Sequence, residues 1–158
     1  MHLALICVGK LRERSFRDAA DEYEKRLARF ARFEEIELAD LPEPANSSPA
    51  IEAQLCRREG EAILSRIRPD DIVVALCIDG KQTDSVRFSQ KLTALADTGR
   101  RVVFVIGGSL GLSPEVVARA QEKLSFSPMT FPHQLARVML LEQLYRACKI
   151  AAGERYHK

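Results

Sequence analysis

Short apolar runs alternate with segments of helical periodicity along the chain. Five such runs occupy positions 3–8, 33–38, 71–78, 101–106 and 122–127. Runs of this length, several of them rich in valine and isoleucine, predict β-strands. Those at 71–78 and 101–106 are largely apolar, which is typical of strands covered on both faces. In the run at 33–38 glutamates interrupt the apolar residues, so this strand should have one face in water and lie near a sheet edge.

Between these runs, apolar residues recur at helical spacing or follow helix-start signals. The helices predicted in this way cover residues 15–30, 49–67, 85–96 and 132–152, and another begins at Ser113 and Pro114. A serine followed by proline supplies a cap and a first helical position. The regular alternation of strand and helix predicts a single-domain α/β fold over residues 1–158, with a mostly parallel sheet flanked by helices.

The composition mainly excludes other classes of protein and other kinds of site. Hydrophobic residues make up 46% of the chain and charged residues 29%, and no apolar stretch approaches the roughly 20 residues that cross a bilayer. The apolar start is too short for a signal peptide and lacks its basic residues. The four cysteines form no CxxC pair and no Cys/His cluster, so we expect neither disulfides nor a metal site. A cytoplasmic protein is the expectation.

Positive charge is concentrated at the C-terminal end. The net charge is only +2, but from position 133 onward five basic residues stand against two acidic ones. The basic residues are Arg137, Arg146, Lys149, Arg155 and Lys158. This excess fits a phosphate-binding surface and equally the solvated face of a helix, and the charge pattern leaves both interpretations open.

Three loops follow predicted strands, which is where open parallel sheets bind ligands. They are a turn at 79–81, a glycine-rich loop at 107–112 and the segment 127–132. Paired glycines let a ligand approach bare backbone, although structural turns use glycine in the same way. The sequence has no dinucleotide fingerprint after its first strand, no P-loop and no HExxH motif. These absences argue against a nicotinamide oxidoreductase.

An ordered set of motifs covers essentially the whole chain and resembles one family. It comprises LALICVGK at 3–10, LCIDGK at 76–81, FVIGGSLGL at 104–112, LSFSPMTFPH at 124–133, LYRA at 144–147 and YH at 156–157. Together these resemble the ribosomal RNA large subunit methyltransferase H family of the SPOUT superfamily. The resemblance implies a homodimer with a C-terminal trefoil knot, a feature very rare among proteins. It also implies S-adenosyl-L-methionine as the cofactor, bound in a bent shape at the knot.

The reaction implied by the resemblance is methyl transfer from S-adenosyl-L-methionine to N3 of a pseudouridine in 23S ribosomal RNA, with the assembled ribosome as substrate. Two alternatives stay open. One is a SPOUT methyltransferase for another ribosomal site or for transfer RNA. The other is a non-catalytic ribosome-binding factor, for which positive charge suffices and cofactor binding is unnecessary.

The resemblance also assigns cofactor-binding residues by motif position. Those implied to surround the cofactor are Leu76, Gly107, Gly108, Ser127, Pro128, Met129, Thr130, Phe131 and Pro132. Apolar side chains with loop amides suit adenine, and the glycines would let the cofactor lie against backbone. For Leu76, Met129 and Phe131, packing in the core is the competing interpretation.

Four residues are candidates for a catalytic role: His157, Tyr156, Arg146 and His133. The nitrogen N3 must lose its proton, and His157 is an attractive base because imidazole titrates near neutral pH. Tyr156 would stack on the target base or orient it, and Arg146 would lie at the substrate site. His133 contacts substrate or cofactor, or it only hydrogen-bonds the helix entrance; both stay open.

The last predicted helix carries two further expectations. Arg137 and Arg146 are nine residues apart and so lie on nearly opposite sides of the helix. In a dimer, one should face RNA and the other the partner subunit or the cofactor. An apolar stripe on this helix fits the core of one chain, but a dimer interface is the favoured hypothesis. The stripe consists of Leu135, Val138, Met139, Leu141, Leu144 and Ile150.

Overall fold

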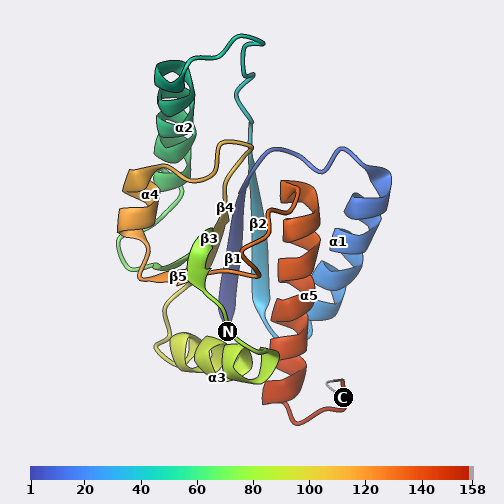
Figure 1. The fold of residues 1–158 in the computed structure, drawn as a ribbon. Helices are drawn as coiled ribbons and strands as arrows, with labels where there is room; N and C mark the ends of the chain where they lie inside the picture. Colours follow the sequence, from blue (N-terminus) through green and yellow to red (C-terminus); the bar gives the residue numbers. More distant parts are fainter. Residues whose placement is uncertain (157–158) are drawn as a thin grey trace.

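The computed structural model describes residues 1–156 and contains a parallel five-stranded sheet between two layers of helices (Figure 1). The strands are β1 (His2–Val8), β2 (Arg32–Leu38), β3 (Ile72–Lys81), β4 (Val102–Ile106) and β5 (Glu122–Leu124). The helices are α1 (Arg14–Leu27), α2 (Pro49–Leu64), α3 (Ser85–Ala96), α4 (Pro114–Arg119) and α5 (His133–Ala151). The sheet order is β2-β1-β4-β3-β5, which confirms the predicted α/β class and the edge position of β2.

The side chains on the two faces of the sheet belong to two separate hydrophobic clusters, because successive residues of a strand point to opposite faces. On β1, Leu3 and Leu5 face the layer of α1, α3 and α5, whereas Ala4 and Ile6 face the layer of α2 and α4. All four side chains are completely buried. A continuous apolar run was therefore the correct signal for a strand covered on both sides.

Local signals set most helix starts. The side chain of Ser48 accepts a hydrogen bond from the Ile51 amide at the start of α2, and Ser113 accepts one from the Val116 amide at the start of α4. Both pairs confirm the predicted serine–proline starts. The far ends were predicted less well, since α2 ends at Leu64 and not at position 67. In the next turn, residues 65–67, the amides of Arg66 and Ile67 donate to carbonyls three residues back, at 3.0 and 3.1 Å, so the α-helical pattern has ended.

The end of β3 differs from the prediction of a strand to position 78 followed by a turn at 79–81. The strand continues to Lys81, but its pairing with β5 shifts, so that Leu76 and Lys81 both lie opposite Leu124. A side chain at Gly80 would come within 2.6 Å of the Leu124 carbonyl carbon, so this close approach requires glycine. The predicted turn was wrong because its backbone hydrogen-bonds to a strand distant in sequence.

The last strand is also shorter than expected. It was predicted to cover 122–127 but ends at Leu124. Ser125 then ties the following segment to β3: its hydroxyl donates to the Ile78 carbonyl at 2.9 Å, and its amide donates to the Lys81 carbonyl at 3.1 Å. Residues 125–127 therefore belong to the loop beyond the sheet.

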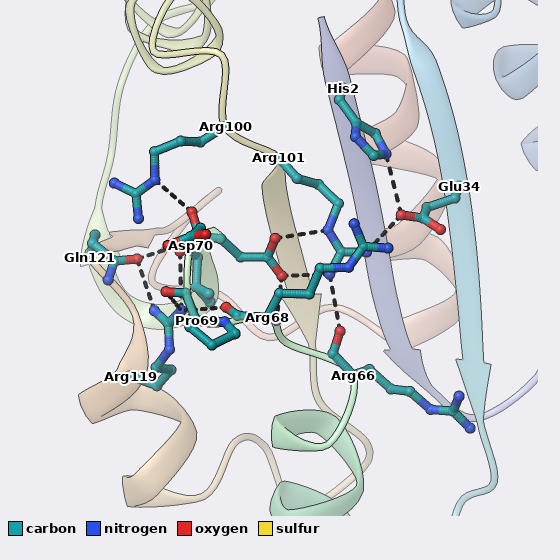
Figure 2. Close-up of polar contacts among 12 residues, drawn as sticks. His2, Glu34, Arg66, Arg68, Pro69, Asp70, Arg100, Arg101, Arg119 and Gln121 are labelled. Carbon is teal, nitrogen blue, oxygen red and sulfur yellow. Dashed lines mark hydrogen bonds and ion pairs between the residues drawn. The ribbon is translucent and has the colours of Figure 1, made fainter.

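A polar network closes the opposite end of the sheet (Figure 2). The guanidinium of Arg101 is 5% exposed and donates to the Asp71 carboxylate and, at 2.6 Å, to Glu34. Arg119 donates to the main-chain carbonyls of residues 68, 69 and 71, at 3.0 to 3.3 Å. These contacts join the starts of β2, β3 and β4 and satisfy carbonyls of the 68–71 turn.

No helix within residues 1–156 is both long and apolar enough to cross a membrane. The same residues contain no group of three or more His, Cys, Asp or Glu side chains that could hold a metal ion.

Candidate functional site

A pocket of about 800 Å³ lies beside residues 76–78 of β3, beyond the C-terminal end of β4, and is bounded by the start of α5. Its volume is in the range of small-molecule sites. Eight of the nine predicted cofactor residues line it: Leu76, Gly107, Gly108, Ser127, Met129, Thr130, Phe131 and Pro132. Pro128 belongs to the same loop but is not part of the lining. The fold thus brings together three segments that are separate in the sequence.

The glycine loop at 107–112 depends on backbone packing that excludes side chains. A Cβ at Gly107 would lie 2.4 Å from the Gly111 carbonyl oxygen. Gly111 has a φ of +77°, and its amide donates to the Gly108 carbonyl at 3.1 Å. The loop therefore folds back on itself directly after β4, and two of its glycines are needed for that shape.

The loop at 127–132 is held by its own serine and presents its apolar residues outward. The Met129 amide donates to the Ser127 hydroxyl at 3.0 Å. Met129 is 70% exposed, and Leu76 and Phe131 are half-buried. Core packing, the competing interpretation, therefore does not hold for Met129. An exposed methionine beside a pocket is available to a ligand.

His133 is the first residue of α5 and lines the same pocket. It packs on Gly9, where a Cβ would lie 3.1 Å from the Nε2 atom of His133. The neighbouring Gln134 fixes the helix start, since its side-chain oxygen accepts from the Arg12 amide at 2.8 Å and the Glu13 amide at 3.2 Å. His133 thus stands both at the helix entrance and in the pocket wall.

Arg146 and Tyr156 lie together at the other end of α5. The Tyr156 hydroxyl donates to Glu142 at 3.3 Å, and the Arg146 guanidinium lies 4.7 Å from the centre of the Tyr156 ring and pairs with Glu142. Burial and the charge of Glu142 raise the pKa of Tyr156. The fourth candidate, His157, lies outside the described residues. Within one chain, the structure does not bring Arg146 and Tyr156 to the pocket.

The separation follows from the length of α5. Position 146 comes thirteen residues after position 133, which at 1.5 Å per residue is roughly 20 Å along the helix axis. Figure 1 shows the last turn of α5 at the opposite end of the helix from the loops that line the pocket.

Arg137 has a structural role, and the prediction that it faces RNA, a partner subunit or the cofactor was wrong. Its side chain is 1% exposed. Its Nε donates to Glu35 and its Nη1 to Glu37 at 2.9 Å, which ties α5 to β2. Arg17 of α1 pairs with the same two glutamates. The glutamates that identified β2 as an edge strand are therefore partners of Arg137.

The carboxyl of Glu24 on α1 completes this cluster. Burial, followed by the negative charge of Glu35, raises the pKa of Glu24 to about 7. In an unfolded chain the same group would titrate near its ordinary value of 4.5. The pKa of Glu24 is therefore higher in the folded protein than in the unfolded chain, so the protonated carboxyl stabilises the fold. This stabilisation is fully present below pH 4.5 and is lost as the pH rises through about 7.

The variant Glu24→Gln should therefore be more stable than the wild type on the alkaline side. We expect a gain of about 1 to 2 kcal/mol in unfolding free energy at about pH 8.5, since the side chain is half-exposed and screened, and a much smaller difference at about pH 5. Urea unfolding at the two pH values measures it. Glu22→Gln, on the exposed side of α1, is the control and should show no such pH dependence; equal effects of Glu24→Gln at both pH values would contradict the assignment.

Comparison with known proteins agrees with the site. The sequence model of the family described as "Predicted SPOUT methyltransferase" matches residues 1–157. A protein of Bifidobacterium animalis subsp. lactis named ribosomal RNA large subunit methyltransferase H is 52% identical over 159 residues, covering 100% of both chains. Proteins of the same name from Bacillus cytotoxicus and Clostridium beijerinckii are 49% and 47% identical, again over 100% of both chains.

A solved structure supports the fold alone. It is titled as a probable methylase family protein from Haemophilus influenzae Rd KW20 and aligns with a TM-score of 0.53 at 13% identity, over 99% of this chain and 70% of that chain.

A parallel sheet with a glycine-lined pocket, together with a family match over nearly every residue, defines a SPOUT methyltransferase. Within that class, the chain belongs to the ribosomal RNA large subunit methyltransferase H family, as its motifs predicted. Membership implies a methyl donor as cofactor. The trefoil knot stays a prediction.

Proposed function

We propose that the protein transfers a methyl group from S-adenosyl-L-methionine to N3 of a pseudouridine in 23S ribosomal RNA, acting as a homodimer on assembled ribosomes in the cytoplasm. The observation that carries the proposal is the pocket at the strand ends, whose lining includes eight of the nine residues that the family motifs assign to the cofactor. The names of relatives at 47 to 52% identity support the substrate. They do not favour another RNA or a non-catalytic factor.

The residues of the pocket fit this cofactor. Among the described residues that line it, none carries a carboxylate, an ammonium or a guanidinium group. Half-buried Leu76 and Phe131 offer an apolar slot for adenine, and the main chain of Gly107 and Gly108 lines the pocket. When bound, the cofactor supplies an electrophilic methyl group on a sulfonium.

The protein's own contribution is to position the target base and to remove its N3 proton. Positioning in line with the methyl group accounts for much of the rate of such a transfer. His133 stands at the pocket wall, where it would contact the cofactor or the base. Tyr156 would stack on or orient the base, Arg146 would hold it by charge, and His157 would accept the proton.

A second subunit is the simplest way to bring the C-terminal tail, which carries Tyr156 and His157, to the pocket together with Arg146. Arg146 and Tyr156 lie roughly 20 Å along α5 from the pocket in their own chain. Val138 and Met139 on α5 are half-buried, and they line a largely apolar groove of about 610 Å³ with Phe126 and Phe88. A symmetric partner covering this groove would place each tail near the other chain's pocket.

The direct test is transfer of radiolabelled methyl from S-adenosyl-L-methionine to ribosomes that lack the modification, beside free 23S RNA. We expect label on assembled ribosomes, mapped to N3 of a pseudouridine. Label at another nucleotide would change the substrate and keep the enzyme class. Cofactor binding without any label on ribosomes would contradict the proposed substrate, and failure to bind the cofactor would contradict the enzyme.

Mixing two inactive variants tests whether the site is shared between subunits. The variant His157→Ala lacks the proposed base, and Gly107→Ala has a disrupted pocket wall. Each should be inactive alone, because every site in either homodimer is defective. After subunit exchange, heterodimers would hold one site with both parts intact, so we expect recovery of about a quarter of wild-type activity. A mixture as inactive as its parents, despite proven exchange, would show that tail and pocket act within one chain.

A further inference from the structure

Glu59 of α2 is a buried carboxylate directly behind the glycine loop of the pocket. Its side chain is 7% exposed. One oxygen, Oε1, accepts a hydrogen bond from the Leu41 amide at 3.2 Å. The other, Oε2, is buried and has no hydrogen-bond partner within residues 1–156. Buried carboxylate oxygens are normally paired, so an unpaired one calls for an explanation.

Only the backbone of Gly108 separates this carboxylate from the pocket. A Cβ at Gly108 would lie 3.1 Å from Oε2 and 3.5 Å from Oε1, and Gly108 itself lines the pocket. The next residue of α2, Gly60, packs so tightly on Ser113 that a Cβ there would lie 2.2 Å from the Ser113 hydroxyl. Glu59 is therefore held against the loop by its hydrogen bond from the Leu41 amide and by the packing of the neighbouring Gly60 on Ser113.

Glu59 supplies a negative charge that the pocket lining itself lacks. The described lining residues include no carboxylate, yet a sulfonium methyl donor carries one more positive charge than the thioether that remains after transfer. A carboxylate a few ångströms behind Gly108 acts through low-dielectric protein, where charge interactions are stronger than in water. It would attract the cationic donor and leave the thioether product unaffected.

We propose that Glu59 is a positioning residue, an inference that rests on the proposed function. Through the backbone of Gly108 it supplies the negative charge that makes the pocket prefer the sulfonium donor over its thioether product. This preference assists turnover, because the product would otherwise compete with the donor for the same contacts. The role needs no direct contact between Glu59 and the ligand.

The test compares binding of S-adenosylmethionine and S-adenosylhomocysteine by titration calorimetry in wild type and in Glu59→Gln. The measurements belong at about pH 8, because burial raises the pKa of Glu59 and the carboxyl must be ionised. Glutamine keeps the volume and the oxygen that accepts from Leu41. We expect the donor to bind about 5- to 10-fold more weakly and the product to bind within about 2-fold of wild type.

Two further variants and one further ligand separate charge from structure. Glu59→Asp keeps the charge and should keep the preference for the donor. Glu61→Gln removes an exposed charge from the same helix and should change neither affinity. Sinefungin, which carries an ammonium in place of the sulfonium, should follow the donor. Thermal unfolding of each variant without ligand reports any purely structural effect.

The outcomes are distinguishable. Equal weakening of donor and product by Glu59→Gln, or an unchanged preference, would overturn the inference and leave the proposed function intact. A wild-type protein that bound neither ligand would overturn the proposed function, and the inference with it.

Discussion

Gly107→Ala is expected to reduce binding of the methyl donor by about 100-fold or more. The added Cβ would lie 2.4 Å from the carbonyl oxygen and 2.6 Å from the carbonyl carbon of Gly111. Backbone atoms cannot move aside as a flexible side chain can, so the loop at 107–112 must open. Since this loop forms one wall of the pocket, the cofactor loses shape complementarity.

Titration calorimetry with S-adenosylmethionine measures this effect, and Gly99→Ala is the matched control. Gly99 has a positive φ, +74°, a Cβ added there would meet no atom within 4 Å, and the residue lies in the turn after α3. That variant should lose about 1 to 2 kcal/mol of stability from backbone strain and keep wild-type affinity. Wild-type affinity in Gly107→Ala would contradict the assignment of the cofactor to this pocket.

Arg137→Ala is expected to lower the unfolding free energy by about 3 to 5 kcal/mol. The substitution leaves Glu35 and Glu37 facing the cavity of a side chain that was 1% exposed, with Arg17 as their remaining cationic partner and the Leu11 amide as a further donor to Glu37. Uncompensated buried charge is among the most costly single changes in a folded protein. Chemical denaturation monitored by circular dichroism measures the loss.

Arg146→Ala is the control on the same helix. Its pair with Glu142 is partly exposed, at 25% and 18%, so its removal should cost about 1 kcal/mol or less. Adding Glu35→Gln to Arg137→Ala should recover part of the loss, because it removes one of the stranded charges. Similar losses for the two arginine variants would show that Arg137 is not the anchor between α5 and β2.

Together, these expected results separate two functions of α5. Its first residue, His133, forms part of the pocket wall, and Arg137 one turn further fixes the helix to the edge of the sheet. A loss of activity after a change at Arg137 would therefore be a loss of fold, whereas a loss of activity at Arg146 with stability kept would support its proposed role at the substrate site.

The sequence by itself determined the elements whose signals are local. Continuous apolar runs identified the central strands, since burial on both faces leaves no polar positions, and serine–proline pairs marked the starts of α2 and α4. The motifs also located the pocket residues, which come from three short segments: residues 76–78 of β3, beyond its pairing with β4, the loop after β4 and the loop after β5. In a parallel sheet such segments must meet at one edge.

Only the tertiary structure decided the features that depend on distant partners. Arg137 finds Glu35 at a separation of 102 residues, so no helical periodicity could distinguish its buried role from an RNA-facing one. The pairing of Lys81 with Leu124 extended β3 through a predicted turn. Glu59 gave no signal within an ordinary charged helix, because its meaning comes from Gly108 on another loop. The distance between the pocket and the C-terminal tail could not be predicted from the sequence either. Sequence motifs determine residue types and their order, whereas the long-range packing of rigid helices determines which of these residues meet.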